Sequence, residues 1–295
     1  MESVINFLNI SKYYGKQPGI AALNLEIYPG EVFGFLGPNG AGKTTTIRLM
    51  LHLLKPSSGR ILVFGKNVSQ YYRQIFKQIG NLPGELKLYE HLSGIHYLDF
   101  MSGFLRNEPR WRNDLLSAFK FSPADLGRKI KYYSHGMKQK LGIIQALQND
   151  PDLIVMDEPT EGLDPLNKTV LYDFLMFLKS RGKTIFFSSH NLAEVEKICD
   201  RVGLVRAGQL IALEGIENLK KKMVRRMEIT FDGDYKAEDF TMDNVAMVDR
   251  QPGRLILNIS GDINPIIKKL SKYKLNNLVF PEPSLEETFM KFYRN

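Results

Sequence analysis

Residues 32–44 read V-F-G-F-L-G-P-N-G-A-G-K-T, an apolar run that enters a glycine-rich turn and ends in a lysine and a threonine. A continuous apolar run of this length is typical of a strand buried on both faces of a parallel sheet. The turn leads into T-T-T-I-R-L-M-L-H-L-L at 44–54, a segment of helix length. Strand, turn and helix in this order predict an α/β domain.

The turn matches G-x-x-x-x-G-K-[ST], the pattern of a phosphate-binding loop. Its glycines let the backbone wrap closely, so that successive amides and the helix N-terminus face phosphate oxygens. Lys43 is expected to reach the β- and γ-phosphates of a nucleotide, and the Thr44 hydroxyl is expected to bind Mg²⁺. The predicted nucleotide-binding residues of this loop are Gly37, Pro38, Asn39, Gly40, Ala41, Gly42, Lys43, Thr44 and Thr45.

Two further buried runs end in polar residues. L-I-V-M-D-E-P-T at 153–160 presents Asp157, predicted to hold Mg²⁺, and Glu158, predicted to polarise a water towards the γ-phosphate. T-I-F-F-S-S-H at 184–190 presents His190. Each feature alone is common at strand ends. Because ligands of open α/β sheets bind where the carboxyl ends of the strands meet, we predict that Glu158, His190 and Lys43 form the catalytic group.

Domain organisation follows from how the pattern changes along the chain. Strands alternate with helices over residues 1–215, but the strand signal disappears between about 86 and 150, which predicts a helical insertion. L-N-L-E-I-Y at 23–28 and R-I-L-V-F at 60–64 alternate in polarity and favour an antiparallel β portion. Residues 216–226, rich in lysine and arginine, are predicted to be a basic linker, and residues 227–295 a small α+β accessory domain.

The cysteine count, the length of the apolar runs and the net charge limit the classes of function that the chain could have. The single cysteine, Cys199, excludes an internal disulfide and fits a reducing compartment. The first residues do not resemble a signal peptide, and no apolar run approaches the roughly 18 residues that span a bilayer. A net charge of +8 permits a nucleic-acid or anionic-membrane partner without requiring one.

Taken together, the motifs resemble those of ATP-binding cassette (ABC) ATPases. The phosphate loop, the helical insertion, Y-S-H-G-M-K-Q at 133–139, L-I-V-M-D-E-P-T, G-L-D at 162–164 and S-S-H occur in the order found in that family. The resemblance covers about residues 1–215. It implies a P-loop NTPase core, ATP and Mg²⁺ as cofactors, and hydrolysis of ATP.

The resemblance also implies a site shared between two chains. Y-S-H-G-M is similar to the family signature, usually L-S-G-G-Q, which caps the γ-phosphate held by a second subunit in a head-to-tail dimer. Ser134 and Gly136 would supply that contact, with Ser134 also able to N-cap a helix. Tyr14 occupies the place of an aromatic that stacks on adenine, although ordinary strand packing is the alternative. Asp164 resembles the interface aspartate and suits an N-cap before Pro165.

Two positions depart from the family pattern. Gly84 stands where the family has a glutamine that contacts Mg²⁺ and the attacking water, with Glu85 beside it. His135 replaces the first of two adjacent glycines in the signature. Its imidazole either adds a hydrogen bond to a phosphate or points away; the second is favoured because the signature acts mainly through backbone and serine.

The predicted function is the ATP-hydrolysing subunit of an ABC membrane transporter. P-S-L-E-E-T-F-M-K-F at 283–292 resembles the end of an accessory domain in ATPases of bacterial exporters. Expected partners are a second ATP-binding subunit, most simply an identical copy, and separately encoded membrane permeases, with the chain on the cytoplasmic face of the membrane. No nucleic-acid partner is expected. The alternatives are a soluble ABC ATPase acting on ribosomes or DNA, and a regulatory module with little hydrolysis.

Overall fold

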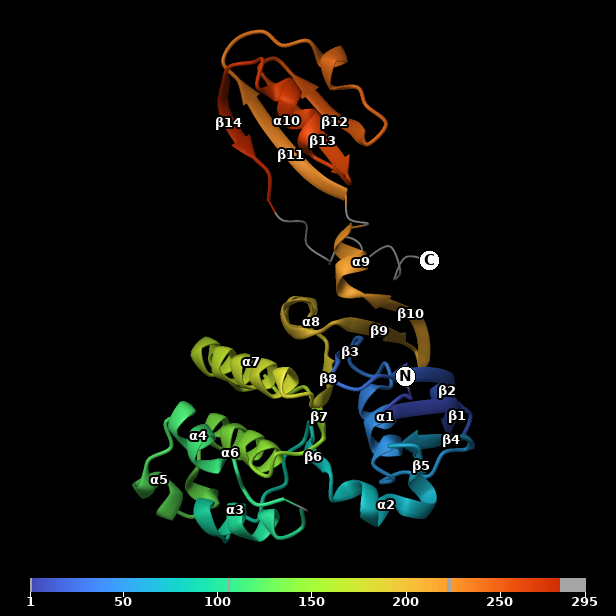
Figure 1. Cartoon of the computed structure of the whole chain (residues 1–295), viewed down its shortest axis with the longest axis vertical. Coiled ribbons are helices and arrows are strands. Elements are labelled where there is room, and N and C mark those ends of the chain that lie inside the picture. Colours follow the sequence, from blue (N-terminus) through green and yellow to red (C-terminus); the bar gives the residue numbers. More distant parts are fainter. Residues whose placement is uncertain (1, 106, 222–223, 282–295) are drawn as a thin grey trace. The chain divides into compact units, whose positions relative to one another are not determined.

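The computed structural model describes residues 2–105, 107–221 and 224–281 of the 295-residue chain. The chain divides into two compact units, residues 1–213 and residues 214–295, which are treated separately below. Figure 1 labels the helices and strands of both units.

The centre of unit 1 is a six-stranded sheet in the order β10-β9-β3-β8-β7-β6. Strand β3 pairs in parallel with β8 and β9, and β7 pairs in parallel with β8 and β6. All residues of β3, β7 and β8 are buried, as expected for central strands of a parallel sheet. The strands are β3 (Val32–Leu36), β6 (Ile79–Leu82), β7 (Leu153–Asp157), β8 (Thr184–Ser189), β9 (Arg201–Arg206) and β10 (Gln209–Gly215).

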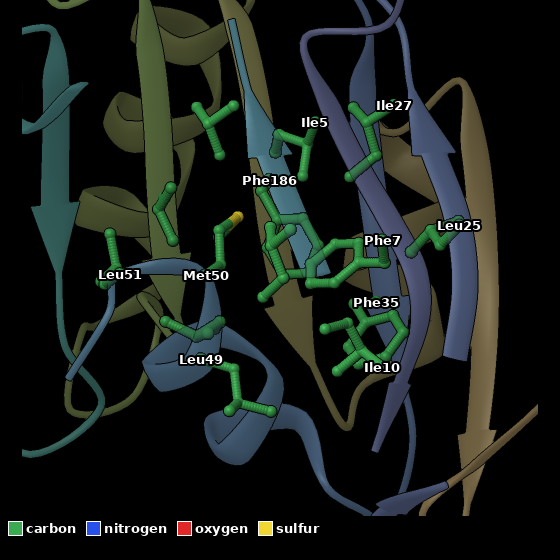
Figure 2. Packing of buried hydrophobic residues seen from close by; sticks show 14 of the residues in the cluster. Ile5, Phe7, Ile10, Leu25, Ile27, Phe35, Leu49, Met50, Leu51 and Phe186 are labelled. Carbon is green, nitrogen blue, oxygen red and sulfur yellow. The ribbon is translucent and has the colours of Figure 1, made fainter. Parts of the chain in front are cut away.

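A second sheet of unit 1 has the order β2-β1-β4-β5 and is antiparallel throughout. Its strands are β1 (Ile5–Tyr14), β2 (Gln17–Ile27), β4 (Ser58–Val63) and β5 (Lys66–Asn67). Phe7 of this sheet belongs to the same buried cluster as Phe35 of β3, Phe186 of β8 and Met50 of helix α1 (Lys43–Met50). Figure 2 shows these side chains filling the space between strands and helix. Burial of this cluster therefore fixes α1, and the loop before it, against both sheets.

The helical insertion occupies the chain between β6 and β7, and Figure 1 shows its helices gathered at one side of unit 1. Serine side chains cap several of these helices: Ser93 accepts from the His96 amide, and Ser122 forms a capping box with Asp125. Helices α1, α2, α7 and α8 of unit 1 lie outside the insertion. The helices are α2 (Val68–Phe76), α3 (Gly94–Ser102), α4 (Arg112–Ala118), α5 (Pro123–Gly127), η1 (Ile130–Tyr132), α6 (His135–Leu147), α7 (Pro165–Ser180) and α8 (Leu192–Ile198).

Unit 2 is a four-stranded antiparallel sheet, in the order β12-β13-β11-β14, with helix α10 against one face. Residues 216–221 form α9, and the basic stretch continues into β11. The tail at 283–292 lies outside the described residues. The elements are α9 (Ile216–Lys221), β11 (Val224–Phe231), η2 (Ala237–Phe240), β12 (Val245–Gln251), β13 (Arg254–Ser260), α10 (Asn264–Leu270) and β14 (Leu275–Val279).

The predicted α/β class with an antiparallel portion is confirmed. One expected helix is shorter than its pattern suggested: α1 ends at Met50, because Leu51 leaves helical geometry and His52 adopts a left-handed backbone with φ 50°. No helix among the described residues combines the length and apolarity needed to cross a bilayer.

Candidate nucleotide site

The glycine-rich loop joins the buried end of β3 to the first turn of α1. Gly42, the residue before the helix, has φ 111°, and a β-carbon there would lie 2.6 Å from the carbonyl oxygen of Gly19. A β-carbon on Gly37 would lie 2.3 Å from the carbonyl oxygen of Val205. Both positions therefore require glycine, and the loop packs closely on β2 and β9 as a result.

Lys43 is buried inside this loop, with 6% of its side chain exposed. Its ammonium donates to the carbonyl oxygen of Gly37 at 2.6 Å and to that of Pro38 at 3.3 Å. The same nitrogen lies 3.0 Å from Oε1 of Glu158. The loop thus holds a positive charge at its centre, which is what recognition of a polyphosphate requires.

Asp157 is placed beside the loop by the sheet. Its Oδ2 accepts a hydrogen bond from the Thr44 hydroxyl at 2.7 Å, and its Oδ1 accepts one from the Ser188 hydroxyl. Asp157 ends β7 and pairs in register with Ser188 of β8, so the contact follows directly from the parallel pairing. A carboxylate and a threonine hydroxyl, both hard oxygen donors, fit the ligand preference of Mg²⁺.

Glu158 has an uncommon backbone for a side chain of its type, with φ 49° in the left-handed region. Its amide donates to the Ser188 hydroxyl at 3.2 Å. Its Oε2 lies 2.8 Å from Nδ1 of His190, while Oε1 faces Lys43. The turn after β7 therefore directs the carboxylate back towards the loop, between the lysine and the histidine.

Tyr14 lines the cavity around the phosphate loop, which has a volume of about 310 Å³ and is bordered also by Gln17, Asn39, Thr45 and Glu158. A β-carbon on Gly19 would lie 2.7 Å from the Tyr14 ring, so this glycine leaves room for the aromatic. Half of the Tyr14 side chain is exposed, and Lys12 lies over the ring. The neighbouring Tyr13 is not among the residues that line the cavity.

Comparison with known proteins shows the family of this chain. A model of the family described as ABC transporter matches residues 20–161. The bacitracin transport ATP-binding protein BcrA of Bacillus licheniformis is 35% identical over 80% of this chain and 78% of its own length. The chain belongs to the ABC transporter family.

Two other ABC relatives extend the comparison. An uncharacterized ABC transporter ATP-binding protein of Nostoc sp. is 42% identical over 69% of this chain, but the match covers only 62% of that protein, less than two thirds of its length. The fluoroquinolones export ATP-binding protein of Mycobacterium tuberculosis is 34% identical over 78% of this chain and 77% of its own length.

The fold agrees with the family. A solved structure described as the ATP binding subunit of an ABC transporter superposes with a TM-score of 0.69 at 27% identity, over 74% of this chain and 92% of that one. The predicted P-loop NTPase core is thereby confirmed. This ABC protein is an ATP-binding transporter subunit and an ATPase.

The signature residues of the ABC protein lie apart from the phosphate loop. Ser134 N-caps α6 by accepting from the Met137 amide, and Asp164 N-caps α7 by accepting from the Asn167 amide. This backbone hydrogen bond lowers the pKa of Asp164, which favours the ionised side chain. Ser134 and Asp164 are exposed, and neither they nor Gly136 line the cavity around Lys43.

At the first departure from the family pattern, Gly84 approaches Asp157. A β-carbon at this position would lie 3.2 Å from Oδ2 of Asp157. Gly84 and Glu85 both line a second cavity of about 520 Å³, which Thr44, Asp157 and Glu158 also border. The loop therefore passes close to the predicted magnesium ligands without a side chain at position 84.

His135, the second departure, lies against Gly162 of its own chain. A β-carbon on Gly162 would lie 2.3 Å from Cδ2 of the imidazole. The ring thus has an intramolecular contact in the turn that precedes Asp164.

One group of site residues was missed from the sequence. Glu194 of α8 is 7% exposed and accepts hydrogen bonds from Thr160 at 2.8 Å and Ser189 at 3.0 Å, and it pairs with Lys168 at 3.0 Å. Burial and this carboxylate raise the pKa of Tyr172. No local sequence signal distinguishes this acidic residue, which follows His190 in a short helix, from a solvent-exposed one. Glu194 ties the ends of β7 and β8 to α7.

Proposed function

We propose that this chain is the ATP-hydrolysing subunit of an ABC exporter, and that it works as a homodimer with separately encoded permeases. The observation that carries the proposal is the meeting of Lys43, Asp157, Glu158 and His190 at one edge of the parallel sheet, around the phosphate loop. The relative named for fluoroquinolones export supports the direction of transport.

Within one chain, the loop from Gly37 to Thr45 binds the phosphates of ATP, and Tyr14 stacks on the adenine. Lys43 neutralises the β- and γ-phosphates, since it is the buried cation at the centre of the loop. The oxygen donors of Thr44 and Asp157 hold Mg²⁺, which supplies charge neutralisation at the phosphates. Ser188 keeps Asp157 oriented through its hydroxyl.

Glu158 acts as the general base towards the attacking water. Its carboxylate is positioned by His190 on one oxygen and by Lys43 on the other. A γ-phosphate competes with Glu158 for Lys43, so ATP binding frees Oε1 to accept a proton from water. His190, whose side chain is 57% exposed, contacts the γ-phosphate from the adjacent strand end.

The dimer completes each site. Ser134 and Gly136 contact the γ-phosphate held by the other chain, and Asp164 lies at the interface. The exposure of Ser134 and Asp164 in the single chain, and the separation of all three residues from the chain's own cavity, support an arrangement in which each signature serves the partner. An N-capping serine and the first amides of α6, a helix of 13 residues, suit an anion.

The permease contact is proposed for an apolar cavity at the edge of the helical insertion. This cavity has a volume of about 330 Å³. Leu53 and Phe104, which line it, expose 65% and 60% of their side chains, more than apolar residues need to. In this proposal the chain docks at the membrane through this surface and lies on the cytoplasmic face. In this proposal residues 1–215 form the ATPase domain, 216–226 a basic linker and 227–295 an accessory domain.

Purification of the tagged chain from membranes of its host tests the proposal. We expect a multi-span membrane protein, encoded by an adjacent gene, to co-purify, and the complex to hydrolyse ATP. Salt-sensitive association with ribosomes or DNA in the absence of any membrane partner would contradict the exporter assignment.

A further inference from the structure

The first two turns of α6 contact the turn between β7 and α7, each at one place. The imidazole of His135 lies over Gly162, where a β-carbon would be 2.3 Å from Cδ2 and 2.5 Å from Nε2. One turn further along α6, the buried side chain of Gln139 donates to the carbonyl oxygen of Pro159 at 2.9 Å. The turn that carries Glu158 is therefore attached to the helix that carries Ser134.

The two partners in the first contact depend on each other. Gly162 has φ 74°, and its α-carbon has no side chain, which leaves the space that the His135 ring takes. A side chain at 162 displaces the imidazole from its place and also carries the strain of a left-handed backbone. With glycine at position 135, as in the usual signature, nothing from that position covers Gly162.

Further anchors of this turn come from other elements. Thr160 donates to the buried Glu194 of α8, and Asp164 begins α7 as its N-cap. Among these contacts, those of His135 and Gln139 join the turn to the signature helix.

We infer that His135 is a positioning residue: by packing against Gly162 it holds the segment 158–164 in fixed register with Ser134. The chain's own base and the serine that it offers to its partner then move as one body. This inference rests on the two-chain site proposed above. It assigns His135 a packing role, with no hydrogen bond to phosphate.

Hydrogen exchange of the isolated chain tests the contact itself. In His135→Ala we expect amides of residues 158–164 to exchange at least about threefold faster, as residues in direct contact couple by this much or more. His135→Phe, which keeps a planar ring but no nitrogen, is expected to retain slow exchange. The matched control His96→Ala alters an exposed histidine of α3 and leaves the segment unchanged. Unchanged exchange in His135→Ala overturns the inference.

A double-mutant cycle tests the geometry. Gly162→Ala in the native background meets both the ring and the backbone strain, whereas in His135→Ala it meets the strain alone. We expect the fold-loss of ATP hydrolysis caused by Gly162→Ala to be at least about threefold smaller in the His135→Ala background than in the native background. Additive losses contradict the contact.

The rates of ATP hydrolysis of two His135 variants distinguish a packing role of the ring from a phosphate-binding role. His135→Phe retains the turnover and His135→Ala loses it, with the affinity for ATP unchanged in both. Equal losses in the two variants show a role for the imidazole nitrogens and overturn the packing role. If Ser134→Ala leaves hydrolysis intact while His135→Ala lowers it, the positioning of Glu158 is supported and the two-chain site is contradicted.

Discussion

Nζ of Lys43 lies 3.0 Å from Oε1 of Glu158. The proposed phosphate-binding lysine and the proposed general base therefore form one buried ion pair. The side chains of Lys43 and Glu158 are 6% and 15% exposed, and an unpaired charge is destabilising at such burial, so each residue stabilises the other. The γ-phosphate of ATP competes for the lysine. Binding of ATP and release of the carboxylate for catalysis are therefore one exchange of partners.

Replacing Glu158 with glutamine removes the base and weakens the competition for Lys43. We expect hydrolysis to fall about 10²- to 10⁴-fold, the range attributed to general-base catalysis, while ATP affinity is retained or rises. Phosphate release and fluorescent-nucleotide binding measure the two effects. Size-exclusion chromatography with ATP should show a stable dimer, and undiminished turnover would remove Glu158 from this role.

Asp157 is expected to matter only when Mg²⁺ is present. Asp157→Asn keeps an oxygen that can accept from Thr44 but removes the charge that holds the cation. Hydrolysis should be lost, and the gain in ATP affinity on adding Mg²⁺ should disappear, while affinity in EDTA stays at the native level. An equal loss of affinity with and without Mg²⁺ would point to a damaged fold instead.

The role of Tyr14 in ATP binding can be distinguished from that of the neighbouring Tyr13. Stacking on a base contributes about 1–3 kcal/mol, so Tyr14→Ala should weaken ATP binding about 5- to 150-fold, and Tyr14→Trp should preserve it. Tyr13→Ala is the matched control, since Tyr13 is exposed to a similar degree, 47% against 50%, but lies outside the cavity lining. Equal effects of the two alanine variants would assign Tyr14 to strand packing.

The thiol of Cys199 is predicted to be inert in the folded chain. Burial raises the pKa of Cys199, which favours the unreactive thiol at neutral pH, and the side chain packs on Gly34 of β3. Maleimide should label the chain only after unfolding by guanidinium, as followed by mass spectrometry. Rapid labelling of the native chain at pH 7 would show that this region of unit 1 opens.

The positions of residues at the ends of strongly apolar strands were predictable from the sequence. Residues 32–36 form β3 with the bounds expected, and Asp157 and His190 lie beside the phosphate loop, because parallel pairing brings strand ends together. Glu194 was not predictable from its motif, since nothing local distinguishes a buried acceptor from a solvated acid. Its three partners come from β8, α7 and the turn after β7, which only the tertiary fold assembles.

The orientation of His135 was beyond the sequence for the same reason. The signature motif indicates a helix capped by Ser134, which the structure contains. The ring's direction depends on the space at Gly162, a residue in a different turn of the chain. The sequence does not show which side chain packs on this glycine, because the two residues are neighbours only in the folded chain.

Mixing two inactive variants tests the two-chain site most directly. Glu158→Gln lacks the base, and Ser134→Arg blocks the contact offered to the partner. If each site combines the phosphate loop and Glu158 of one chain with Ser134 of the other, mixed dimers contain one complete site. Random pairing should then restore about a quarter of the native ATP hydrolysis, because about half of the dimers are mixed. A mixture that stays as inactive as its components, although mixed dimers are shown to form, would contradict the account.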